Sequence, residues 1–208
     1  MPLFRGRSVD LKPALWALAV VLWIAGAAAG LYQVWVYDNA PGRAATPPER
    51  WSGPETVPTG GRPTLVLLAH PQCSCTRATL TELAEVLARV ERRPQTYVYF
   101  LKPFGFPEGW EHSDLWRTAS ALPDVTVIRD DDGEQARKLG AATSGQVLLY
   151  DADGSLLFAS GITASRAHVG ENAGRSALVA LLNSGAAAPG STTPVFGCSL
   201  FGPDAEQS

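Results

Sequence analysis

The most constraining feature of the sequence is a long stretch near its N-terminus that contains no charged residue, Ala14 to Tyr37. An α-helix needs about 20 predominantly apolar residues to cross the hydrocarbon core of a bilayer. This stretch exceeds that length, and Trp35 and Tyr37 at its far end are of the types that favour a membrane interface. The sequence therefore predicts one transmembrane helix over residues 14–37, with the lipid bilayer as its partner.

Positive charges predict how this helix is oriented. Arg5, Arg7 and Lys12 precede the apolar stretch, and short segments rich in Lys and Arg stay in the cytoplasm. We therefore expect residues 1–13 to be cytoplasmic. The chain after the helix is expected on the periplasmic or extracellular side of the cytoplasmic (inner) membrane. That compartment is oxidising, so a pair of cysteines there can form a disulfide.

A cleaved signal peptide is the alternative for the same stretch. Ala25 to Ala29 is rich in small residues, as a signal-peptidase site requires. The apolar run continues beyond this point through Leu31, Val34 and Val36, which favours a retained signal-anchor. Both interpretations place the rest of the chain outside the cytoplasm.

The remaining sequence divides into three parts by composition. Residues 38–62 are rich in Pro and Gly and show no apolar periodicity, which is typical of a semi-stiff linker. Residues 63–184 contain the regular apolar patterns of a folded domain. Residues 185–208 form a Gly-, Ala- and Pro-rich tail, interrupted by an apolar island that contains Cys198.

The domain alternates strand and helix patterns. Short apolar or β-branched runs predict strands at Thr64–Ala69, Thr96–Leu101, Val125–Ile128, Gln146–Tyr150 and Leu156–Ser160. Amphipathic or capped segments predict helices at Thr76–Arg92, Ser113–Ala121, Asp132–Leu139 and Arg175–Asn183. The turn Asp151-Ala152-Asp153-Gly154 predicts that the last two strands form a hairpin. This order of elements predicts an α/β sandwich.

Two cysteines lie where the first strand meets the first long helix, in the motif His70-Pro71-Gln72-Cys73-Ser74-Cys75. A helix N-terminus carries unpaired N–H groups and about half a positive charge. It therefore stabilises a thiolate, lowers the pKa of the thiol and makes it a nucleophile near neutral pH. We predict Cys73 and Cys75 to be catalytic redox residues, with His70 placed to orient or protonate the thiolate.

With this motif and this order of elements, the chain resembles the thioredoxin-like superfamily over about residues 64–183. It is also similar to a group of membrane-anchored bacterial thioredoxin-like proteins with a His-Pro-x-Cys-x-Cys motif (RedB-like proteins). The resemblance implies a thioredoxin-like three-layer α/β sandwich, preceded here by one transmembrane helix. It also implies a redox cysteine at the junction of strand and helix.

The sequence departs from the family pattern at two places. The family's usual spacing is Cys-x-x-Cys, which would put its second cysteine at Thr76, whereas here it is Cys75. The small ring of a Cys-x-Cys disulfide is prone to strain, so we expect a couple that is easily reduced. The family also has a cis-proline before the hairpin strand, where Thr143, Ser144 and Gly145 stand here. Without that proline there is room near the sulfurs for another group, including a metal.

The leading functional hypothesis is a membrane-tethered extracytoplasmic thiol–disulfide oxidoreductase without an organic cofactor, whose partners are extracytoplasmic thiol or disulfide proteins. A copper(I)-binding chaperone is the alternative, with Cys73, Cys75 and His70 as ligands, because thiolates and imidazole suit a soft ion. A non-catalytic thioredoxin-fold adaptor is the third hypothesis. The net charge is −3 and no Lys/Arg cluster is present, so nucleic acid is not expected as a partner.

Further residues are candidates for the same site. The apolar island Pro194–Phe201 would be costly to leave exposed, so we expect it to dock on the domain and bring Cys198 in as a third thiol. Arg77, one helical turn beyond Cys73, would add positive charge if it points back. The other candidates for lining a pocket lie before the hairpin and in the long loop after it: Thr143, Gly145, Arg166, His168 and Asn172.

Overall fold

The computed structural model describes residues 11–51, 61–185 and 192–202, and the chain forms two compact units that divide after Asp38. The first unit is helix α1, Lys12–Asp38. This helix is long and apolar enough to cross a membrane, a test that a signal sequence near the N-terminus would pass equally. No residue of α1 is buried.

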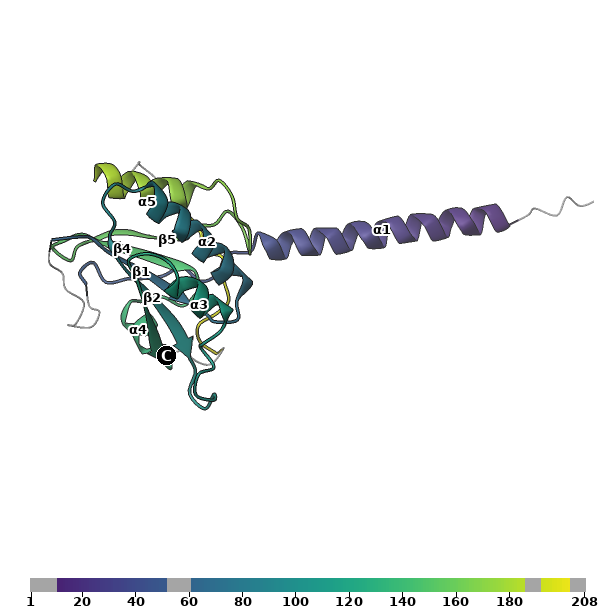
Figure 1. Ribbon diagram of the computed structural model, residues 1–208. Coiled ribbons are helices and arrows are strands. Elements are labelled where there is room, and N and C mark those ends of the chain that lie inside the picture. Colours follow the sequence, from purple (N-terminus) through teal and green to yellow (C-terminus); the bar gives the residue numbers. More distant parts are fainter. Residues whose placement is uncertain (1–10, 52–60, 186–191, 203–208) are drawn as a thin grey trace, which may run out of the picture. The chain divides into compact units, whose positions relative to one another are not determined.

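The second unit is built on a five-stranded mixed sheet with the order β3-β2-β1-β4-β5 (Figure 1). The strands are β1 Thr64–Ala69, β2 Gln95–Lys102, β3 Val125–Asp131, β4 Gln146–Tyr150 and β5 Leu156–Ser160. β1, β2 and β3 run parallel to one another, whereas β4 pairs antiparallel with both β1 and β5. This order and these directions are those of the thioredoxin-like fold, so the predicted fold class is confirmed.

The helices of this unit cover both faces of the sheet, which gives the three layers. They are α2 Ser74–Arg89, α3 Asp114–Ser120, α4 Glu134–Lys138 and α5 Ala173–Ser184. Alternate residues of a strand point to opposite faces. Accordingly Leu65 and Leu67 of β1 belong to a core with α2, α3 and α5, whereas Val66 and Leu68 belong to a second core with α4. Figure 1 shows α2 and α5 together above the sheet and α4 on the opposite side.

The connection from β1 to α2 is short, and it fixes the cysteine motif at the carboxyl end of the central strand. Cys73 is the N-cap residue of α2, with extended backbone angles, and Cys75 lies in the first turn. The helix begins at Ser74, two residues before the predicted start, and ends at Arg89 rather than at Arg92. The periodic face of α2 that was predicted to be apolar is buried in the first core.

Part of the segment predicted as a linker lies against the domain. The backbone N–H of Thr46 donates to the carbonyl of Gly140 (2.9 Å), and that of Leu156 donates to the carbonyl of Glu49 (2.8 Å). The ring of Trp51 packs edge-on against Tyr150, with centroids 5.2 Å apart. Backbone hydrogen bonds of this kind do not require apolar residues at regular spacing. The sequence of this segment therefore shows only its Pro- and Gly-rich composition, which predicted a linker over its whole length.

Candidate functional site

The site is centred on Cys73, at the point where β1 passes into α2. Its backbone N–H donates to the carbonyl of His70 (3.3 Å), and its own carbonyl accepts from the N–H of Arg77 (3.2 Å). These bonds hold the sulfur over the first turn of the helix, where free N–H groups and the helix dipole favour negative charge. The residue is only 1% exposed.

The sulfur of Cys73 is surrounded by hydrogen-bond donors. Its pKa is lowered from the ordinary value to about 3 by hydrogen bonds, which outweigh the opposing effect of burial. In order of size, these bonds come from the Cys75 thiol, the Cys198 thiol, the Ser144 hydroxyl and the backbone N–H of Thr76. The Cys198 Sγ lies 2.8 Å from the Cys73 Sγ, and the Ser144 Oγ lies 3.4 Å from it. Cys73 is therefore held as a thiolate.

The pKa values of the two neighbouring thiols, Cys75 and Cys198, are shifted upward. The hydrogen bond to Cys73, together with burial, raises the pKa of the Cys75 thiol, against a backbone N–H bond from Ala167. Burial of the Cys198 sulfur and its bond to Cys73 raise the pKa of that thiol to about 12. The three cysteines thus form one thiolate with two protonated donors, and none of them is in a disulfide.

His70 lies close to this cluster but its ring is engaged elsewhere. Its Nδ1 accepts from the backbone N–H of Gln72 (3.2 Å), and the ring packs edge-on against Trp110 with centroids 5.5 Å apart. Burial lowers the pKa of His70, and the nearby Cys73 thiolate opposes this shift. Within the described residues, no hydrogen bond joins the ring to a sulfur. The described geometry gives the imidazole no direct proton path to Cys73.

Ser144 is a residue of the site that the sequence analysis did not select. Its hydroxyl lies between two cysteines, since it donates to the Cys73 sulfur and accepts from the backbone N–H of Cys198 (2.9 Å). It stands immediately before Gly145 and β4, the place where the family resemblance implied a cis-proline. Only its position could have indicated this role, because the family resemblance places this stretch next to the sulfurs.

Gly145 itself is explained by its backbone. Its φ is +86°, a conformation that L side chains rarely adopt, and its N–H donates to the carbonyl of Leu68 in β1 (2.7 Å). A Cβ there would lie 3.0 Å from the Oγ1 of Thr79 and 3.2 Å from the carbonyl oxygen of Phe196. Glycine is therefore needed both for the turn and for the close approach of the C-terminal segment.

The C-terminal segment, residues 192–202, covers the site. The carbonyl of Cys198 accepts from the N–H of Ser144 (2.9 Å), and the N–H of Leu200 donates to the carbonyl of Ala142 (2.9 Å). Thr143 and Ser199 form an antiparallel bridge between these two bonds. The apolar side chains of the segment are buried on the domain: Val195, Phe196 and Leu200.

Two of the other candidates from the sequence lie beside this segment. The guanidinium of Arg166 donates to the carbonyl of Gly197 (2.8 Å) and to that of Ala40 (3.2 Å). The hydroxyl of Thr143 donates to the carbonyl of Arg43 (2.9 Å). Both side chains thus bind backbone of the covering segments rather than line an open cleft.

Within the described residues, the side chains of the remaining candidates make no hydrogen bond to a sulfur. Arg77 pairs with Asp114 at 2.6 Å on the surface of the domain, so its charge is directed away from Cys73. His168 is exposed. Asn172 is the N-cap of α5, where its side chain accepts from the N–H of Arg175 (2.7 Å).

The long loop after β5 contributes through its backbone. Ala167 has a φ of +53°, and its N–H donates to the sulfur of Cys75. The loop is anchored to α2 by the buried carboxylate of Glu82, which accepts from the N–H of Gly170 (2.7 Å) and pairs with Arg175 at 2.5 Å. Backbone donors of this kind have no residue signature, so Ala167 could not be recognised from its residue type.

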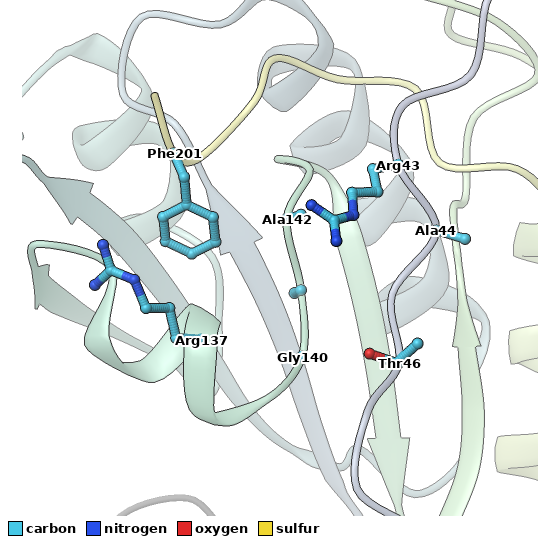
Figure 2. Close-up of a pocket in the computed structure, with 8 residues that line it drawn as sticks. Arg43, Ala44, Thr46, Arg137, Gly140, Ala142 and Phe201 are labelled. Atoms are coloured by element: carbon cyan, nitrogen blue, oxygen red, sulfur yellow. The ribbon is translucent and has the colours of Figure 1, made fainter. Parts of the chain in front are cut away.

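A pocket of about 520 Å³ lies next to the covering segment. Figure 2 shows Phe201 and Arg137 on one side of it and Arg43 and Thr46 on the other, with Gly140 and Ala142 between them. The guanidinium of Arg137 stacks on the ring of Phe201, 4.6 Å from its centroid. The pocket is therefore closed in part by the C-terminal segment, and its shape depends on that segment being docked.

Two solved structures share the fold of this chain at low sequence identity. No protein-family model matches the sequence, and no curated protein matches it. An uncharacterised conserved protein from Geobacillus kaustophilus superposes with a TM-score of 0.57 at 20% identity, over 79% of this chain and 93% of that one. A hypothetical protein from Sinorhizobium meliloti gives 0.54 at 16% identity, over 79% and 97%. A secreted disulfide oxidoreductase from Mycobacterium tuberculosis gives 0.45 at 19% identity, over 67% and 96%.

Proposed function

We propose that this chain is a membrane-tethered extracytoplasmic thiol–disulfide oxidoreductase in which Cys73 is the nucleophile. The observation that carries the proposal is the set of donors around one sulfur. Cys73 caps the N-terminus of α2 and receives hydrogen bonds that lower its pKa to about 3. A thiolate is the form that attacks disulfides. A merely structural cysteine needs no such set of donors.

The chemistry needs only the protein's own thiols. The Cys73 thiolate attacks one sulfur of a partner disulfide, a mixed disulfide forms, and the partner's other sulfur leaves as a thiolate that takes a proton from solvent. A second thiol of this chain, deprotonated to water, then attacks the Cys73 sulfur. The partner is released reduced, and this chain carries the disulfide. The reverse sequence would oxidise a partner dithiol.

The proposal includes a location. Helix α1 is apolar over a length that can cross a bilayer, and the basic residues Arg5, Arg7 and Lys12 precede its apolar stretch. By the positive-inside rule the N-terminus stays in the cytoplasm. The domain then lies in the periplasm or outside the cell, anchored in the cytoplasmic (inner) membrane, where its partners are thiol or disulfide proteins.

The test traps the first chemical step. In a full-length double variant, Cys75→Ser and Cys198→Ser, Cys73 is the single cysteine and both neighbours keep a hydroxyl donor. Incubated in detergent with glutathione disulfide, this chain should form a mixed disulfide at Cys73, also at mildly acidic pH. Mass spectrometry of the intact chain measures the adduct.

The control is a Cys73→Ser variant that retains Cys75 and Cys198. It should form adducts slowly, because burial raises the pKa of both remaining thiols and does so without Cys73. A Cβ at Gly197 would overlap the carbonyl oxygen of Ser144 and loosen the C-terminal segment over Cys73. If the double variant stays unmodified even with Gly197→Ala added, while its fold is intact, Cys73 is not a nucleophile and the proposal fails.

Copper(I) binding is the second candidate function. The observation that favours it is the presence of soft ligands side by side, since the sulfurs of Cys73 and Cys198 lie 2.8 Å apart with Cys75 bonded to the first. Within the described residues, however, no group of three His, Cys, Asp or Glu side chains is arranged to hold a metal ion. A copper site here would use thiolates without His70 in its described position.

Titration of the reduced full-length chain with copper(I) in the presence of a competing chelator separates the two functions. Tight binding that is lost in Cys75→Ser, with no disulfide exchange at Cys73, would favour a chaperone. Exchange without tight binding favours the oxidoreductase. Neither activity in a folded chain would leave the non-catalytic adaptor.

A further inference from the structure

The reactive sulfur of this site is covered by the protein's own chain. Cys73 is 1% exposed, although a nucleophile must meet its partner's disulfide in line with the sulfur–sulfur bond. The atoms nearest to its sulfur include the Cys198 Sγ and the Ser144 Oγ, and the former comes from the C-terminal segment. An external disulfide can therefore reach Cys73 only after this segment moves.

The segment is bound in the manner of a substrate peptide. Its backbone pairs with residues 142–144 through two hydrogen bonds and a bridge, as an extended peptide adds to a free edge. The side chains of Phe196 and Leu200, on either side of the cysteine, are buried on the domain. The cysteine between them points its sulfur at Cys73.

The fit is close at one residue. A Cβ on Gly197 would overlap the carbonyl oxygen of Ser144, so a glycine is required for the segment to lie where it does. From the other side, the guanidinium of Arg166 holds the Gly197 carbonyl at 2.8 Å. Gly202, further along the same segment, has nothing within 4 Å of such a Cβ. An alanine at Gly197 should therefore disrupt docking of the segment, and an alanine at Gly202 is a matched control that should leave docking intact.

We propose that residues 195–201 are an internal substrate of the site: Cys198 forms the resting disulfide with Cys73, and a partner polypeptide with an extended cysteine-containing segment must displace it from residues 142–144. This inference rests on the proposed function and names both the second thiol and the class of partner.

The steps balance without a further reagent. After Cys73 has attacked a partner disulfide, the Cys198 thiolate attacks the Cys73 sulfur, the Cys73–Cys198 disulfide forms, and the reduced partner leaves as a thiolate that takes up a proton. The partner gains two electrons and the two cysteines lose two. A dithiol protein of the same compartment returns these two electrons to Cys73 and Cys198 by thiol–disulfide exchange. The Cys75 thiolate can also attack the Cys73 sulfur of the Cys73–Cys198 disulfide. A Cys73–Cys75 disulfide then forms with no net redox change, and Cys198 leaves as a thiolate, which frees the C-terminal segment.

Geometry favours Cys198 over Cys75 as the resting partner of Cys73. A disulfide between Cys73 and Cys75 would close a small, strained ring within the start of a helix. Cys75 is also held by the N–H of Ala167 and donates its own hydrogen to Cys73. Cys198 approaches from a separate segment and already lies with its sulfur 2.8 Å from that of Cys73.

The experiment maps the disulfide in the full-length chain. The protein is equilibrated in detergent with dithiothreitol buffers of graded redox ratio, free thiols are alkylated in acid, and unreduced peptides are identified by mass spectrometry. We expect the Cys73–Cys198 peptide to exceed the Cys73–Cys75 peptide by at least about tenfold, because strained disulfides are reduced more easily. In Gly197→Ala the ratio should fall by a similar factor and alkylation of reduced Cys73 should accelerate. Gly202→Ala should match the wild type in both measurements.

Different failures have different meanings. If the wild type forms mainly Cys73–Cys75 while Cys198 stays alkylated, the internal substrate is refuted and the oxidoreductase stands. If Cys73 enters no disulfide in any buffer, the proposed function itself fails. Leu200→Ala removes a buried contact of the same segment and should act like Gly197→Ala. A ratio that is unchanged in both folded variants would show that docking does not direct the pairing, and would also overturn the inference.

Discussion

Replacing Cys75 by Ala removes the donor that contributes most to the low pKa of Cys73. A hydrogen bond to a charged group contributes about 1.5–3 kcal/mol, and one pKa unit corresponds to about 1.4 kcal/mol. With the donors from Cys198, Ser144 and Thr76 still in place, the pKa of Cys73 should rise by about one to two units. Since it starts at about 3, Cys73 should remain a thiolate at neutral pH, so the variant stays reactive.

The assay is the pH dependence of alkylation, followed by mass spectrometry on the peptide that contains Cys73. Cys198 does not interfere with the midpoint, because its pKa is raised to about 12. Cys75→Ser is the matched control, since its hydroxyl can replace the lost donor and should keep the midpoint close to that of the wild type. An Ala variant whose profile coincides with the wild type would refute the hydrogen-bond argument. A Ser variant shifted as far as the Ala variant would show that packing, and not donation, sets the pKa.

Three further predictions concern the frame of the site. Glu82→Gln leaves a buried arginine without its counter-charge and should lower the free energy of unfolding by about 3–5 kcal/mol in urea titrations; Glu85→Gln, in an exposed pair, should cost less than about 1 kcal/mol. Gly145→Ala combines a positive φ with close contacts, so it should destabilise the domain more than Gly61→Ala, which has the same sign of φ and open space around it; equal losses would contradict the packing argument. The pKa of His70 is lowered by burial, so the unfolded chain binds its proton first. The neutral imidazole contributes its full stability above the pKa that His70 has in the unfolded chain. This contribution is lost as the pH falls through the lower pKa of His70 in the folded protein. A His70→Gln variant should therefore lose less free energy of unfolding on acidification than the wild type.

The fold could be predicted because its central strands carry strong local signals. Thr64–Ala69 and Gln146–Tyr150 are buried throughout, so their apolar runs mark both ends of each strand. β3 was predicted too short, because it continues from Ile128 to Asp131 through charged residues. Asp130 is buried there, and its carboxylate accepts from the N–H groups of Gln135 and Ala136 at the start of α4. A polar run at a strand end is indistinguishable in sequence from a solvated turn.

The site was predictable only as far as it depends on side-chain type and on neighbouring positions. The motif around Cys73 places the sulfur at a helix start by local rules alone. Its other partners come from far along the chain, and they act through a hydroxyl at Ser144 and a backbone N–H at Ala167. Neither a lone serine nor an alanine in a loop carries a signal of its own. The direction of Arg77 was equally open, because it depends on the position of Asp114 in three dimensions.

The cover over Cys73 has a consequence for its survival in an oxidising compartment. An ionised sulfur is the form that peroxides convert to sulfenic and then irreversibly to sulfinic acid, and this damage increases with exposure. With the C-terminal segment in place, so little of Cys73 meets solvent that small oxidants should find it far less often than a polypeptide able to compete for the segment's binding edge. Access, rather than intrinsic reactivity, would then decide which molecules this thiolate encounters.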